Sequence, residues 1–140
     1  MQVRKVWEAK LMAAGLAVAL ATGGCATVDD SKSWVDIKAP GELRTLFSDK
    51  TFTGKGSYDI PSSWVSYNRA DGHGLFVIDA RKYPYTWAVS GEDRICTQSE
   101  RGGNCYRYQR HASTAKFYRS LNLKTERYNE FTVENGIPNF

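Results

Sequence analysis

Residues 94–110 read RICTQSERGGNCYRYQR, which places Cys96 and Cys105 nine positions apart on either side of a Gly-Gly pair. If the two flanks pair as an antiparallel hairpin across the glycines, Cys96 faces Cys105 and Ile95 faces Tyr106. Directly opposed residues of such a pair lie about 4.5 to 5.5 Å apart between Cα atoms, which a disulfide can bridge. The stretch therefore predicts a disulfide-closed β-hairpin.

A zinc site or a redox centre is the alternative use of this cysteine pair. Structural zinc prefers cysteines about two to four residues apart with a second ligand pair, and a redox site prefers Cys-x-x-Cys. The spacing here fits neither pattern. We therefore expect a structural disulfide, with no metal and no other cofactor.

The third cysteine, Cys25, ends a segment typical of an export signal. A basic start, MQVRKVWEAK, is followed by a twelve-residue apolar run, well short of the roughly 20 residues that span a bilayer. The run closes on TGGC, which resembles the lipobox of bacterial lipoproteins, where the leader is cut before an acylated cysteine. We predict a lipoprotein signal peptide over residues 1–24 and lipidation of Cys25. Ordinary cleavage nearby, leaving a free thiol, is the alternative.

The predicted anchor implies a place in the cell. Two or three acyl chains hold a protein firmly on a membrane, at about 0.8 kcal/mol for each buried CH₂ group. Residue 26 is alanine rather than aspartate, which by the lipoprotein sorting convention favours the outer membrane. We expect a bacterial envelope protein, lipid-anchored in the outer membrane and facing the periplasm, where disulfides persist.

Composition and charge indicate one folded domain without a nucleic-acid surface. The chain has 140 residues, of which 13% are aromatic and 24% charged, as in ordinary globular domains. The net charge is +4 for the whole chain, and 16 basic and 14 acidic residues remain after Cys25. So small an excess gives no reason to expect a nucleic-acid partner.

A tether and a short helix are predicted before the strands. Residues 25–38 are polar without a clear period, as in a flexible tether, so a single domain is expected over 39–140. The segment PGELRTLFSDK then spaces Leu43, Leu46 and Phe47 at i, i+3 and i+4 behind a proline suited to a first helical turn. This pattern predicts a short amphipathic helix that packs as a lid or plug.

From Thr51 onward the chain is typical of antiparallel β-structure. Turn residues recur about every 8 to 12 positions, and an Asp-Gly turn joins two candidate strands. YTWAVS alternates cleanly, with Tyr85, Trp87 and Val89 on one face. We expect seven or eight strands in a small barrel or a two-sheet sandwich, and prefer the barrel because it hides strand edges.

A family resemblance follows from the order of these segments. GELRTLFSDKTFTG, the Asp-Gly hairpin, YTWAVSGEDRICTQ with a second cysteine, and a closing FTVENGIPNF resemble an uncharacterised, domain-of-unknown-function family of small secreted and lipid-anchored proteobacterial proteins. The resemblance covers about residues 40–140. It departs at NGIPN, where a tighter Gly-Asn-Pro ending is expected. The features that carry it are Leu43, the Thr53-Gly54 step, Trp87, the cysteine pair and Asn135-Gly136. It implies a lipocalin-like barrel and carries no established activity.

Two histidines are the titratable candidates for catalysis. They are His73 and His111, with Ser113, Asp71, Asp79 and Glu92 as conceivable partners. No nucleophile motif or phosphate-binding loop surrounds either one, and a metal shared by both rests on no local spacing. We therefore assign no catalytic residue and no metal ligand. An envelope enzyme that uses His73 or His111 stays an alternative.

One strand face offers a candidate anion or ligand site. In the hairpin register Arg94 lies opposite Arg107 on the cysteine face, and Gln109 extends that face. Opposed like charges are mildly destabilising, so such a pair is either well solvated or holds an anion. Trp64 lies in a segment that alternates poorly, and exposure of its ring would favour a glycan or another ligand.

These observations favour a binding or interaction module without catalysis. Its partner would be an envelope protein, an anionic glycan or a small amphiphile, besides the membrane that holds the acyl chains. The alternative is an inhibitor or structural accessory of an envelope or host hydrolase, acting through the SGED or QSERGG loop. An open apolar pocket would favour a small ligand, whereas a filled barrel would move the site to the surface.

Overall fold

The computed structural model describes residues 33–56 and 60–138. The predicted signal peptide and Cys25 lie outside these ranges. Within them, no helix is long and apolar enough to cross a bilayer. The elements are β1 (Trp34–Ile37), α1 (Pro40–Phe47), β2 (Lys50–Gly54), β3 (Trp64–Asn68), β4 (His73–Ile78), β5 (Arg81–Ser90), β6 (Arg94–Ser99), β7 (Gly102–His111), β8 (Phe117–Asn122) and β9 (Tyr128–Asn135).

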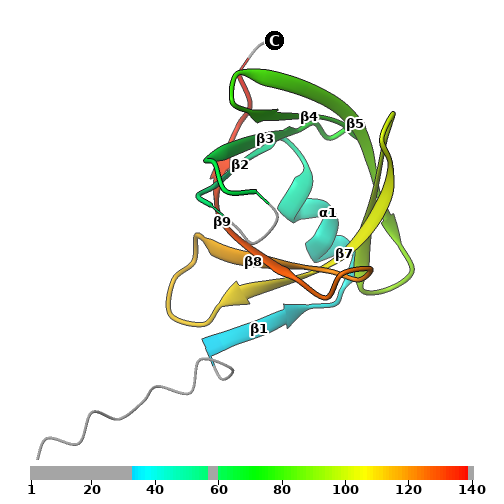
Figure 1. The fold of residues 1–140 in the computed structure, drawn as a ribbon. Helices are drawn as coiled ribbons and strands as arrows, with labels where there is room; N and C mark the ends of the chain where they lie inside the picture. Colours follow the sequence, from blue (N-terminus) through cyan, green and yellow to red (C-terminus); the bar gives the residue numbers. More distant parts are fainter. Residues whose placement is uncertain (1–32, 57–59, 139–140) are drawn as a thin grey trace, which may run out of the picture.

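Strands β2 to β9 form a closed, up-and-down antiparallel barrel (Figure 1). Each strand pairs with the next along the chain, and β9 returns to pair with β2. The predicted small barrel is confirmed, and the two-sheet sandwich is not the fold. Closure removes the exposed edges that an open sheet would present.

Strand β1 is additional to the eight strands of the closed ring and pairs with the end of β7, beyond the residues that pair with β6. This corrects the predicted tether, because residues 34–37 belong to the domain, which therefore begins before residue 39. Trp34 is buried, with its ring centroid 5.1 Å from that of His111 and 5.4 Å from that of Phe117. The strand shows no period of two because its buried residues, Trp34 and Ile37, are three apart.

Helix α1 plugs the barrel, as its apolar spacing predicts. Figure 1 shows the helix inside the ring of strands. Leu43, Leu46 and Phe47 are buried, and Pro40 occupies the first turn. Burial of one apolar face against several strands stabilises a helix that would be too short to persist alone.

The cysteine hairpin has the predicted register. Cys96 pairs with Cys105, and Ile95 pairs with Tyr106. A disulfide joins the two cysteines, whose Cα atoms are 4.0 Å apart. Ile95 points into the core with no exposed surface, so alternation along the strand places the disulfide on the outer wall of the barrel.

Removing this disulfide should lower the stability of the barrel. In the chain-entropy model a ring of about ten residues contributes roughly 2.7 kcal/mol. We expect that loss in the free energy of unfolding for Cys96→Ser/Cys105→Ser, measured by urea unfolding in a Cys25→Ala background that excludes thiol exchange. The reduced parent should match the variant. A loss below about 1 kcal/mol would show that the bond contributes little.

Candidate functional site

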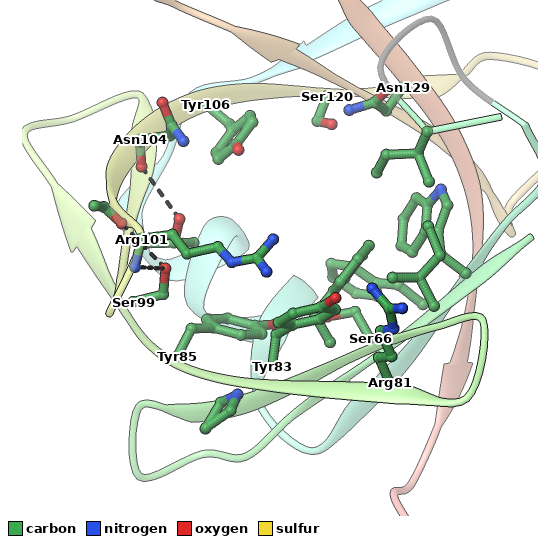
Figure 2. A pocket seen from close by; sticks show the side chains of 18 of the residues that line it. Ser66, Arg81, Tyr83, Tyr85, Ser99, Arg101, Asn104, Tyr106, Ser120 and Asn129 are labelled. Atoms are coloured by element: carbon green, nitrogen blue, oxygen red, sulfur yellow. Dashed lines mark hydrogen bonds between the residues drawn. The ribbon is translucent and has the colours of Figure 1, made fainter. Parts of the chain in front are cut away.

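The barrel interior holds a cavity of about 590 Å³. Phe47, at the end of the α1 plug, forms part of its floor, and the β4–β5 and β6–β7 turns border its mouth. Figure 2 looks into this opening and shows side chains arranged around an empty centre. The volume falls within the range of about 300 to 1,000 Å³ that is typical of small-molecule sites.

Aromatic side chains form most of the floor and walls, and two glycines leave room for two of these rings to lie flat against the wall. A Cβ added at Gly54 would lie 2.1 Å from Cε2 of Trp64, its partner on β3. A Cβ at Gly74 would lie 2.3 Å from Cζ of Tyr85, its partner on β5. Each ring therefore packs against bare backbone and leaves the lumen open. The aromatic lining consists of Phe47, Phe52, Trp64, Phe76, Tyr83, Tyr85, Tyr106 and Tyr108.

Neutral polar groups also face the lumen. The Ser66 hydroxyl lies 2.6 Å from the Tyr85 hydroxyl, which donates a hydrogen bond to Oδ1 of Asn68. Trp64 Nε1 and Asn129 Oδ1 are buried without a hydrogen-bond partner among the described residues. A buried polar atom left unpaired costs about 1 to 3 kcal/mol. A bound molecule with matching polar atoms would recover part of that cost.

Burial raises the pKa values of two tyrosines in this site. It raises the pKa of Tyr85 to about 12, although the hydrogen bond from Ser66 opposes the change. Burial also raises the pKa of Tyr108 well above its usual value, and Tyr106 adds to this effect. Both phenols therefore stay uncharged hydrogen-bonding groups to a more alkaline pH than an exposed tyrosine does.

Charged side chains gather at the mouth. Arg81 and Arg101 line the opening together with Asp79 and Glu100. Figure 2 shows both arginines reaching toward the lumen. The Arg101 guanidinium lies 4.6 Å from the centroid of the Tyr83 ring, a cation–π contact.

The structure brings Arg94 and Arg107 of the predicted anion site together around Asp93, whereas Gln109 and Trp64 make other contacts. Asp93 lies between Arg94 and Arg107, with its carboxylate oxygens 3.0 Å from Nε of each. The hydrogen bond from Arg94 is the largest cause that lowers the pKa of this carboxyl. Gln109 bonds to other side chains of the outer wall, whereas Trp64 is 6% exposed and lines the lumen. The opposed arginines therefore share a carboxylate of the chain itself.

The two histidines lie apart from the cavity lining. Nδ1 of His73 is 3.2 Å from Oδ1 of Asp71, and Nδ1 of His111 is 2.9 Å from Oγ of Ser113. His73 therefore has a carboxylate beside it but no nucleophile, and His111 has a hydroxyl beside it but no carboxylate. Neither histidine borders the cavity. Asp79, which the sequence offered as a catalytic partner for a histidine, lies instead at the mouth of the cavity. In residues 33–56 and 60–138, no three His, Cys, Asp or Glu side chains are grouped to hold a metal.

Sequence reasoning missed most of the lumen. Along β5, Arg81 and Tyr83 continue the inward row of Tyr85 and Trp87, so extending that alternation would have found them. On β8 the pattern misleads. Its buried residues are Ser120 and Asn122, at alternate positions, while the apolar Phe117 and Leu121 occupy the intervening positions that face outward.

No protein-family model, curated protein or solved structure matches this chain. Its chemistry is therefore inferred from the cavity. An aromatic floor, neutral polar groups at mid-depth and charges at the mouth suit a molecule with an apolar body and a polar end.

Proposed function

We propose that this protein binds a small amphiphile inside its barrel and serves as a ligand-binding module of the bacterial envelope. The observation that carries the proposal is the hollow lumen of about 590 Å³, which has an aromatic floor and an open mouth. Small eight-stranded barrels either fill with their own side chains or hold one small ligand.

The lumen is hollow for a local reason that supports this proposal. Gly54, at the end of β2, and Gly74, near the start of β4, each lie beneath an aromatic ring, although glycine weakens a strand through its backbone entropy. Larger residues at these two positions would push Trp64 and Tyr85 into the lumen. The glycines therefore favour an open interior over maximal strand stability. The envelope location still depends on the predicted lipidation of Cys25.

Filling the lumen should weaken binding without unfolding the barrel. Ser120 is buried on the inner face of β8 and borders the cavity. We expect Ser120→Trp to weaken binding of N-phenylnaphthylamine, a neutral fluorescent amphiphile, at least tenfold, because the indole would occupy the ligand's volume. Fluorescence titration measures the Kd, and circular dichroism checks that the fold persists.

A matched control places the same side chain outside. Thr86 is exposed on the outer face of β5, so Thr86→Trp should leave the Kd within about twofold, as expected for a surface substitution. If the parent does not bind the probe, or if Ser120→Trp binds it as tightly as the parent does, the lumen is not the site. An outer-surface interaction with a protein or glycan would then be the better hypothesis.

A further inference from the structure

We infer that the polar end of the bound amphiphile is an anionic group, such as a carboxylate, sulfonate or phosphate, held at the mouth by Arg81 and Arg101. This inference rests on the proposed function, since it assumes that the apolar body of the ligand occupies the lumen. It adds the chemical class of the ligand and the two residues that select it.

Arg101 is held over the opening by its local structure. It lies in the β6–β7 turn, where its backbone N–H donates to Oγ of Ser99 at 3.2 Å. The central carbon of its guanidinium lies over the Tyr83 ring, 4.6 Å from the ring centroid. This cation–π contact holds the side chain without pairing its charge with a carboxylate. Figure 2 shows this group projecting over the lumen.

Arg81 reaches the mouth from the neighbouring turn. Asp79 and Ala80 both have positive φ, of 48° and 62°, as a two-residue type I′ hairpin turn requires. Positive φ is uncommon for alanine, so this tight turn is a specific feature of the rim. It begins β5 at Arg81, opposite Ile78, with the arginine side chain on the cavity lining.

Carboxylates are close by but form no ion pair with these arginines. Asp79 and Glu100 also line the mouth, yet none of the ion pairs formed among the described residues includes either arginine or either acid. Asp79 instead accepts a hydrogen bond from Ser62 at 3.3 Å. Both guanidinium groups therefore keep donors available for a ligand.

The balance of charges at the mouth sharpens the expected specificity. Two arginines and two acids nearly cancel at a distance, so the mouth should not attract free small anions strongly. An amphiphile differs because its buried body holds its anionic end within hydrogen-bond reach of the arginines. We therefore expect amphiphilic anions to bind well and inorganic phosphate to bind weakly.

A pair of matched probes tests the inference. Anilinonaphthalene sulfonate carries nearly the same rings as N-phenylnaphthylamine and adds a sulfonate. We expect the parent protein to bind the sulfonate more tightly than the neutral probe. Arg81→Gln/Arg101→Gln should raise the Kd of the sulfonate roughly tenfold or more, as expected for loss of charge-assisted hydrogen bonds, and should change that of the neutral probe less than about twofold.

Three controls make the result specific to the mouth. Arg110→Gln removes the same charge from a second hollow, beside α1, and should leave both Kd values unchanged. Glu100→Gln should tighten binding of the sulfonate only, because it removes a like charge. Inorganic phosphate at millimolar concentration should not displace the sulfonate, which separates an amphiphile site from a simple phosphate site.

The outcomes separate this inference from the proposed function. If both probes bind equally and the double arginine variant changes neither Kd, the anionic group is wrong while lumen binding stands. Equal weakening of both probes would mean that the arginines support the fold, and it would also overturn the inference. If neither probe binds the parent, both proposals fail.

Discussion

Phe47→Ala should lower the free energy of unfolding by about 3 to 5 kcal/mol, the cost typical of truncating a buried phenylalanine. Phe47 is 2% exposed and ends the plug helix. Its ring centroid lies 4.9 Å from that of Phe52, 5.0 Å from that of Trp87 and 5.3 Å from that of Tyr108. It therefore packs against three different strands of the barrel, β2, β5 and β7. Truncation would leave a void that opens into the lumen. Urea unfolding followed by circular dichroism measures the loss.

Arg44→Ala provides the control on the same helix. Arg44 is exposed, and alanine is a good helix former, so its free energy of unfolding should stay within about 0.5 kcal/mol of the parent. A loss below about 1 kcal/mol for Phe47→Ala would contradict a plug that holds the barrel together. The helix would then be a lid that the barrel does not need.

Alkaline pH should destabilise the barrel through its buried phenols. Burial raises the pKa of Tyr85 to about 12 and that of Tyr108 well above its usual value, whereas an unfolded tyrosine titrates near 10. Because the unfolded chain loses these protons first, their contribution is complete below about pH 10 and is lost as the pH rises toward 12. Two phenols together give a slope of about −2.7 kcal/mol per pH unit.

Single tyrosine-to-phenylalanine variants show which tyrosine causes that slope. We expect Tyr85→Phe and Tyr108→Phe each to remove about half of it, because each deletes one raised pKa. Urea unfolding at several pH values between 8 and about 11.5 measures the slope, and tyrosinate absorbance reports when the phenols ionise. Tyr85→Phe should also weaken the barrel at neutral pH, since Ser66 and Asn68 lose their common partner. A slope that neither variant changes would show that other groups control alkaline unfolding.

Local patterns predicted the elements whose side chains act on near neighbours. The plug helix follows from the spacing of Leu43, Leu46 and Phe47, and the disulfide follows from opposed cysteines around a glycine turn. The clean alternation around Trp87 identified the inner face of β5. In each case a period of 3.6 or 2 links sequence directly to a buried face.

Prediction failed where burial came from distant parts of the chain. Residues 34–37 form a strand because Trp34 packs against rings of β7 and β8, more than seventy positions away. Arg94 and Arg107 are opposed as predicted, but the strand pattern did not reveal that Asp93 forms an ion pair with each of them. On β8 the inner face carries the polar Ser120 and Asn122 beside Tyr118, which packs against the core. In a hollow barrel the inward-facing residues of a strand need not all be apolar. The alternation of apolar and polar residues is therefore a weaker guide to which side faces inward.

The sequence by itself therefore determined the β class, the plug helix and the cysteine hairpin, because these depend on residue spacing within one segment. Only the tertiary structure decided that the barrel closes, that it is hollow, and that Arg81 and Arg101 both line its mouth. A cavity is a difference between the volume enclosed by all the strands and the volume their side chains fill. No single strand records that difference, and glycines such as Gly54 reveal their role only once the facing ring is known.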